Sequence, residues 1–143
     1  MFTINHYLDR FEIVEYLMRI KTDPRDNSLS GFIWFDFDDV IVGEKPSPAF
    51  PHPYEPEDIN YWIGVFWQLE RMQEGESHRI EFLCANRLSF VYTILDNGFI
   101  NIKHYHDDDI LWEKEFSRIT FFEETHRFEA SIKKELLLAE QQT

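Results

Sequence analysis

The stretch from Gly31 to Val42 constrains the fold more than any other part of the chain, and it reads Gly-Phe-Ile-Trp-Phe-Asp-Phe-Asp-Asp-Val-Ile-Val. Its side chains alternate: one face of a strand would carry Ile33, Phe35 and Phe37, and the other would carry Trp34, Asp36 and Asp38. An acidic face opposite an aromatic face is typical of an antiparallel strand with one buried and one solvated side. We expect a turn at Asp38-Asp39 and a short partner strand over 40–42.

Other segments show equally clear periodicities. Alternation predicts a short strand over 2–8, three strands over 80–84, 88–94 and 100–104, and an edge strand over 110–112. Asn97-Gly98 predicts a hairpin, because both residues tolerate positive φ. Apolar residues at helical spacing predict helices over 10–21, 56–72 and 121–140, with capping boxes at Asp9/Glu12 and Thr120/Glu123. The five prolines between 46 and 56 predict an extended loop over 43–56.

Helix 56–72 is apolar on almost every side, which predicts that it is buried or covered by a partner. Pro56 suits its first turn. Gly64 lies in its middle, and we expect a neighbouring element to approach closely there. In the last helix, i,i+4 spacing predicts the ion pairs Glu123–Arg127 and Glu129–Lys133.

The order of these elements predicts an α+β fold. We expect one antiparallel sheet of about five strands, with the N-terminal helix, the central tryptophan-bearing helix and the C-terminal helix packed mainly on one face. A doubly wound parallel sheet would require strands and helices to alternate, and they do not alternate after residue 78. The length of 143 residues predicts a single domain over 1–143.

The charge of the chain disfavours several classes of partner. It has 14 basic and 27 acidic residues, giving a formal net charge of −13. Such a surface repels nucleic-acid backbones and anionic membranes, and it attracts basic proteins. The alternative is that the acidity serves only solubility.

Cysteine content and the apolar runs bear on the compartment. Cys84 is the only cysteine, so no disulfide framework and no cysteine-based zinc site are expected. The first residues lack the basic and apolar regions of a signal peptide, and no apolar run reaches the roughly 18 residues of a membrane span. We therefore expect a cytoplasmic protein. Separately, we expect it to have no cofactor.

Residues 34–42 resemble the first motif of haloacid-dehalogenase-type phosphatases. The resemblance implies that Asp36 is a nucleophile and Asp38 an acid/base near Mg²⁺, which would offset the repulsion between carboxylate and phosphate. Asp39 stands where that family commonly has glycine. The family's later lysine has no convincing counterpart, and the region after residue 78 is predicted to be antiparallel rather than parallel. A phosphatase is therefore the second hypothesis.

A metal site is a further alternative. His104 and His106 are two residues apart on a predicted strand, so their side chains point the same way, and Asp108 follows them. This spacing suits Zn²⁺ or another transition metal, although no third or fourth ligand is imposed by the pattern.

The acidic residues fall into three groups, and they are Asp36, Asp38 and Asp39; Glu55, Glu57 and Asp58; and Asp107, Asp108 and Asp109. They are either three solvated loops or parts of one docking face. Tyr61 and Trp67 on helix 56–72 would be natural aromatic anchors beside such a face. The predicted binding residues are therefore Asp36, Asp38, Asp39, Glu57, Asp58, Tyr61, Trp67, Asp107, Asp108 and Asp109.

The whole arrangement is similar to small acidic immunity proteins of bacterial polymorphic-toxin and contact-dependent-inhibition systems. The similar features are the strand pair opening at Gly31, the tryptophan-bearing helix after Tyr54, three strands and a terminal helix. The resemblance implies a stoichiometric inhibitor that binds a cognate toxin domain, often a basic nuclease, and performs no chemistry. A third hypothesis is a regulatory or structural binding module, a monomer or a homodimer formed through helix 56–72.

Overall fold

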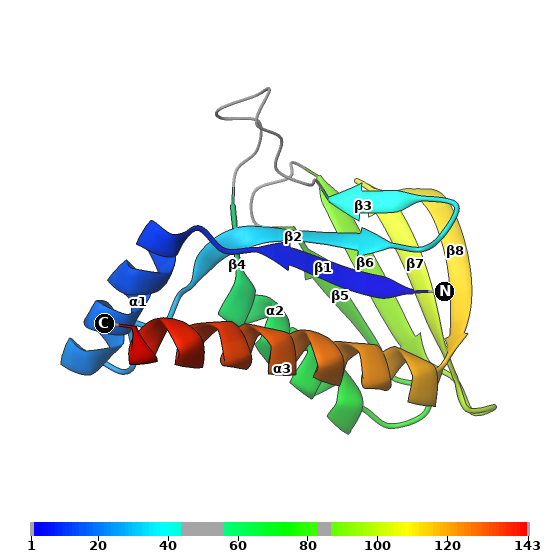
Figure 1. The fold of residues 1–143 in the computed structure, drawn as a ribbon. Coiled ribbons are helices and arrows are strands. Elements are labelled where there is room, and N and C mark those ends of the chain that lie inside the picture. Colours follow the sequence, from blue (N-terminus) through cyan, green and yellow to red (C-terminus); the bar gives the residue numbers. More distant parts are fainter. Residues whose placement is uncertain (1, 44–55, 83–86, 143) are drawn as a thin grey trace. The chain divides into compact units, whose positions relative to one another are not determined.

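The structure is a computed structural model, and it describes residues 2–43, 56–82 and 87–142. These residues form three α-helices and two antiparallel sheets of four strands each (Figure 1). The predicted α+β class and the three helices are confirmed, and the prediction of one sheet of about five strands is wrong. The proline-rich loop, Glu55 and Cys84 lie outside the described residues.

The chain divides into two compact units, each with its own sheet. Unit 1 contains Met1–Ile63 and Glu124–Thr143, and unit 2 contains Gly64–Glu123. Helices α2 (Ile59–Arg71) and α3 (Arg118–Gln141) each run from one unit into the other. The single domain over 1–143 stays a prediction.

The sheet of unit 1 is built around β2 (Ser30–Asp36), which pairs antiparallel with each of its partners. The partners are β1 (Thr3–Tyr7), β3 (Ile41–Gly43) and β4 (Glu57–Asp58). The alternation read from the sequence is confirmed, because Ile33, Phe35 and Phe37 are buried whereas Asp38 is exposed. The Phe35 ring packs against that of Trp62 on α2, with their centroids 5.1 Å apart.

The aspartates after β2 form the turn that was expected there. Asp36 Oδ1 accepts a hydrogen bond from the Asp38 N–H at 2.9 Å, and the Phe37 N–H donates to the Val40 carbonyl at 2.9 Å. Asp38 has φ 74°, a conformation that Asp tolerates better than most residues. At Gly43, where φ is 90°, an added Cβ would lie 2.6 Å from the Ile33 carbonyl oxygen, so the close approach of β2 requires glycine.

The beginnings of the helices were predicted only in part. Helix α1 (Arg10–Thr22) begins as expected, with Asp9 Oδ1 accepting from the Phe11 N–H at 2.9 Å. Helix α2 begins at Ile59 rather than at Pro56, because the residues before it pair with β2 as β4. Helix α3 begins at Arg118, so Thr120 lies inside the helix and the capping box predicted there is wrong.

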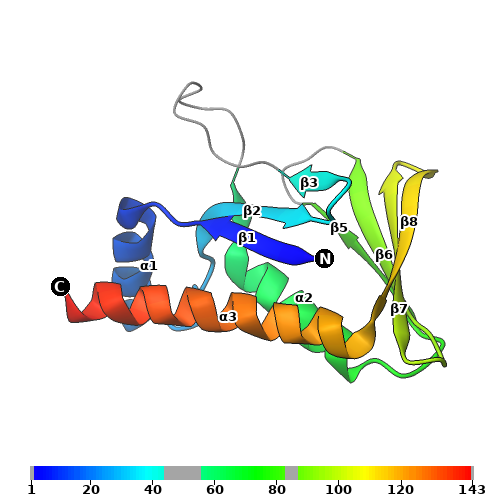
Figure 2. The ribbon, with the colours of Figure 1, turned by 45° about the vertical axis from the view of Figure 1, so that its right-hand side comes forward.

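Unit 2 contains a four-stranded meander in which each strand pairs with the next along the chain (Figure 2). Its strands are β5 (Ser77–Glu81), β6 (Leu88–Ile94), β7 (Phe99–His106) and β8 (Asp109–Ser117). The hairpin at Asn97-Gly98 is confirmed, but only Gly98 has positive φ. The Leu95 N–H donates to the Phe99 carbonyl at 3.0 Å, so the turn has three residues and ends in a glycine.

Aromatic rings fill the core of unit 2. Phe121 in the first turn of α3 contacts Tyr92 of β6 at 5.7 Å and Phe66 of α2 at 6.4 Å, between ring centroids. The start of α3 therefore lies against the face of the sheet that carries Tyr92, and Phe66 of α2 packs against that part of α3. The close neighbour predicted at Gly64 is absent, since nothing lies within 4 Å of an added Cβ.

Candidate functional site

The turn between β7 and β8 places three carboxylates at one end of the sheet of unit 2. His106 pairs with Asp109, and Asp107 and Asp108 form the two-residue turn between them. Asp107, Asp108 and Asp109 are all exposed, and Asp107 has φ 55°. This third acidic group of the sequence is thus displayed on a hairpin anchored in a continuous sheet.

A β-bulge presents two apolar side chains directly beside these carboxylates. The pairing shifts from His104–Trp112 to Tyr105–Ile110, which leaves Leu111 as the extra residue of β8. Ile110 and Leu111 are 53% and 54% exposed. We call Asp107, Asp108, Asp109, Ile110 and Leu111 the tip surface. Sequence analysis missed the two apolar members, although the run Ile110-Leu111-Trp112 breaks strict alternation and was the available signal.

Two arginines hold the base of the tip surface. Arg79 of β5 donates from Nη2 to the Asp107 carbonyl at 2.7 Å, and its guanidinium lies over the Tyr105 ring at 5.0 Å. Arg87 forms an exposed ion pair with Asp107 at 3.4 Å. Among the described residues, the carboxylates of Asp108 and Asp109 form no such pair, so they are available to an external cation.

The other two acidic groups do not lie together. Asp36 is at one end of β2, and β4, which carries Glu57 and Asp58, pairs with Ser30 and Gly31 at the other end. Six residues of extended strand separate the two ends by roughly 20 Å. Within unit 1, therefore, these groups do not converge on one site.

Glu57 and Asp58 have roles in the fold of unit 1. Glu57 is 7% exposed, and its Oε1 accepts from the Trp62 indole N–H at 3.2 Å. Asp58 Oδ1 accepts from the backbone N–H groups of Leu29 at 3.0 Å and Asn60 at 3.1 Å, which caps α2. Both carboxylates therefore have partners within the fold, and their part in docking stays a prediction. Their pairing with β2 could not be read from local sequence.

The predicted aromatic anchors differ in exposure. Tyr61 is half-buried and packs edge-on against Trp62, with the ring centroids 6.1 Å apart. Trp67 is 47% exposed on α2 and belongs to unit 2. Of the two, Trp67 is the better placed to meet a ligand.

The setting of Asp36 differs from the one that the phosphatase resemblance implies. The strand that carries it is antiparallel to all of its partners, whereas the resemblance implies a parallel sheet. Asp36 also uses Oδ1 to close the hairpin turn.

The predicted histidine metal site is not assembled by the fold. Within the described part of the chain, no three His, Cys, Asp or Glu side chains come together to hold a metal ion. His106 is exposed, but His104 is 4% exposed and its Nδ1 lies 3.1 Å from the Ser89 carbonyl oxygen. The His104 ring lies among three aromatic rings. Its centroid is 5.0 Å from that of Phe90, 5.3 Å from that of Trp112 and 6.4 Å from that of Phe82.

This apolar setting predicts that His104 makes folding sensitive to acid. Burial lowers the pKa of His104 below 6.5, against a smaller opposing effect of the hydrogen bond to Ser89. As pH falls through about 6.5, His104 binds a proton in the unfolded chain but not yet in the folded chain. The free energy of unfolding therefore declines with acidification. The expected slope is at most about 1.4 kcal/mol per pH unit from this group.

Urea unfolding near neutral pH and about two units below it measures this effect. His104→Phe should lose that part of the pH dependence, and the exposed His106→Gln should keep it. Equal pH dependence in the wild type and His104→Phe would contradict the assignment.

Comparison of the chain with protein-family models, with curated protein sequences and with solved structures found no match. Within the described ranges, no helix combines the length and apolar character needed to cross a bilayer.

Proposed function

We propose that this protein is a non-enzymatic binding protein that binds a basic protein partner through the tip surface. The observation that carries the proposal is that the carboxylates of Asp108 and Asp109, which form no ion pair with another described residue, lie beside the exposed side chains of Ile110 and Leu111. Acidic groups beside an apolar patch suit a partner with a positively charged rim around an apolar contact.

The two kinds of side chain would serve different stages of binding. The net charge of −13 raises the rate of encounter with a cationic surface. Desolvated apolar contacts then slow dissociation. Of the partners with this chemistry, we propose a cognate toxin domain, as the resemblance to acidic immunity proteins implies, with the protein acting as its stoichiometric inhibitor in the cytoplasm.

The test is to measure association with the purified product of the neighbouring gene by surface plasmon resonance. The double variant Asp108→Asn/Asp109→Asn should lower the association rate constant about three- to tenfold at low salt and flatten its salt dependence. Leu111→Ser should instead raise the dissociation rate constant by about tenfold or more.

The matched control is Asp96→Asn/Glu115→Gln, which removes the same charge from exposed positions toward the opposite end of the same sheet. It should change the rates far less than the tip variant. Absence of a tight complex would contradict the pairing with that product, and equal effects of the two double variants would contradict the tip surface as the binding site.

A further inference from the structure

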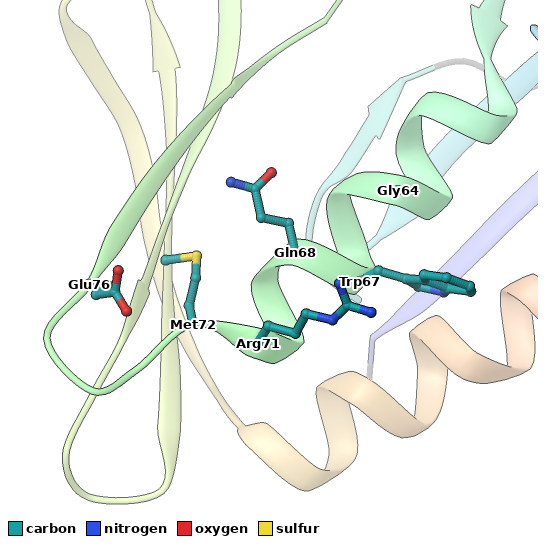
Figure 3. Close-up of a pocket in the computed structure, with 6 residues that line it drawn as sticks. All are labelled: Gly64, Trp67, Gln68, Arg71, Met72 and Glu76. Atoms are coloured by element: carbon teal, nitrogen blue, oxygen red, sulfur yellow. The ribbon is translucent and has the colours of Figure 1, made fainter. Parts of the chain in front are cut away.

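An open hollow lies in unit 2 along the second half of α2, away from the tip surface. It has a volume of about 370 Å³, and its lining residues are Gly64, Trp67, Gln68, Arg71, Met72 and Glu76 (Figure 3). This volume is within the range of roughly 300–1,000 Å³ that small-molecule sites occupy. Because Gly64 has no side chain and nothing lies within 4 Å of an added Cβ, the helix backbone is accessible there.

The lining comes mostly from successive turns of one helix. Trp67 and Arg71 are four residues apart, so their side chains are neighbours on the helix surface. Figure 3 shows these two side chains extending to the same side of α2, while Gln68 and Met72 extend to another. An aromatic ring and a guanidinium are thus offered together.

Arg71 is the chemically informative member of this set. It is exposed and, among the described residues, forms no ion pair or side-chain hydrogen bond, in a chain with nearly twice as many acidic as basic residues. The carboxylate of Glu76, the acidic residue of the lining, accepts the Gln73 N–H at 2.7 Å through Oε1. The Arg71 guanidinium therefore retains its capacity to bind a carboxylate in a bidentate geometry.

We infer that this hollow binds a small aromatic carboxylate. The carboxylate pairs with the Arg71 guanidinium, and the ring lies against the Trp67 indole, whose exposed fraction is 47%. Gln68 and Met72, which extend to another side of α2, line the rest of the hollow.

This site is separate from the proposed docking function. The Glu76 carbonyl accepts the Ile94 N–H, at the end of the sheet where β6 turns into β7. The tip surface lies at the other end of β7, roughly 20 Å away along the strand. Loss of one activity therefore does not imply loss of the other.

The test is a titration followed by NMR, with 3-phenylpropionate as the ligand and the Trp67 indole N–H signal as the readout. That signal is assigned by its disappearance in Trp67→Phe. We expect it to shift saturably at millimolar ligand, and we expect no saturable shift with propionate, which lacks the ring, or with 3-phenylpropanamide, which lacks the charge.

Arg71→Gln should weaken binding by about tenfold or more, because it removes the charge-assisted pair. Lys103→Gln is the control, a basic residue of β7 in the same unit that does not line the hollow, and it should bind as the wild type does. A tripeptide ending in phenylalanine, with a free or an amidated C-terminus, distinguishes a peptide terminus from a free acid as the source of the carboxylate. No saturable shift, equal binding of the amide, or unchanged affinity of Arg71→Gln would overturn the inference.

Discussion

Replacing Trp62 with alanine is expected to lower the free energy of unfolding by about 3–5 kcal/mol, the usual cost of truncating a buried large aromatic residue. Trp62 is fully buried, and its ring packs at 5.1 Å from that of Phe35. Its indole N–H also donates to the buried carboxylate of Glu57 at 3.2 Å. The variant therefore creates a cavity and removes a donor from an acidic group held out of water.

Urea denaturation of two further variants separates these contributions. Trp62→Phe keeps most of the ring volume and loses the indole donor, so it should be less destabilising than alanine, with about 1–3 kcal/mol attributable to the hydrogen bond. Trp67→Ala, a tryptophan of the same helix that is 47% exposed, should cost much less. Similar losses for Trp62→Ala and Trp67→Ala would show that burial is not what distinguishes the two residues.

Local patterning accounts for the parts of the fold that the sequence predicted well. The alternation around Phe35 is confirmed because one face of β2 is buried and the other is solvated. The periodicity of the last helix is confirmed for Phe121, Phe128 and Ile132, which are all buried. In both cases the pattern is set by neighbours along the chain, which is what periodicity reports.

Features that depend on distant segments were missed. The strand β4 has only two residues, and it exists because β2 extends far enough to pair with it. The same pairing placed Glu57 in the core and moved the start of α2 to Ile59. The division into two sheets likewise depends on pairing between strands rather than on any local signal, since each strand alone looks alike in either arrangement.

The candidate site was predicted unevenly for the same reason. The acidic residues at 107–109 were identified from their clustering along the sequence. The exposure of both Ile110 and Leu111 beside them accompanies a bulge, and the lack of an ion pair at Arg71 among the described residues depends on which carboxylates the fold brings near it. Spacing along the chain shows a break in alternation at Ile110-Leu111-Trp112, but it does not show which carboxylates lie near Arg71.

Replacing Glu124 with alanine is expected to lower the free energy of unfolding by about 3 kcal/mol, because hydrogen bonds to charged groups are worth about 1.5–3 kcal/mol each. Glu124 Oε2 accepts the Ile4 N–H at 2.6 Å, and Arg127 Nη2 donates to the Ile4 carbonyl at 2.6 Å. Arg127 also donates to both oxygens of Glu124, which raises the pKa of the guanidinium above its ordinary value. A side-chain pair on α3 therefore satisfies both outward backbone groups of Ile4 on the edge strand β1.

Glu123→Ala is the control, because the sequence predicts Glu123 as the partner of Arg127 whereas the structure pairs Arg127 with Glu124. Helical spacing predicts a Glu123–Arg127 pair, yet Arg127 pairs with Glu124 at i,i+3, while the other predicted pair, Glu129–Lys133, is confirmed at 2.6 Å. Glu123 is exposed, so its replacement should change stability by less than about 0.5 kcal/mol.

The Glu124→Ala substitution also leaves the edge of β1 unsatisfied at Ile4. An unsatisfied strand edge can pair with another chain. Glu124→Ala should therefore show concentration-dependent association in gel filtration, whereas Glu124→Gln, which retains an acceptor for the Ile4 N–H, should associate less and lose less stability. If Glu123→Ala proved as costly as Glu124→Ala, the pairing at Ile4 would have no special role, and protection of this edge would have to come from another part of the chain.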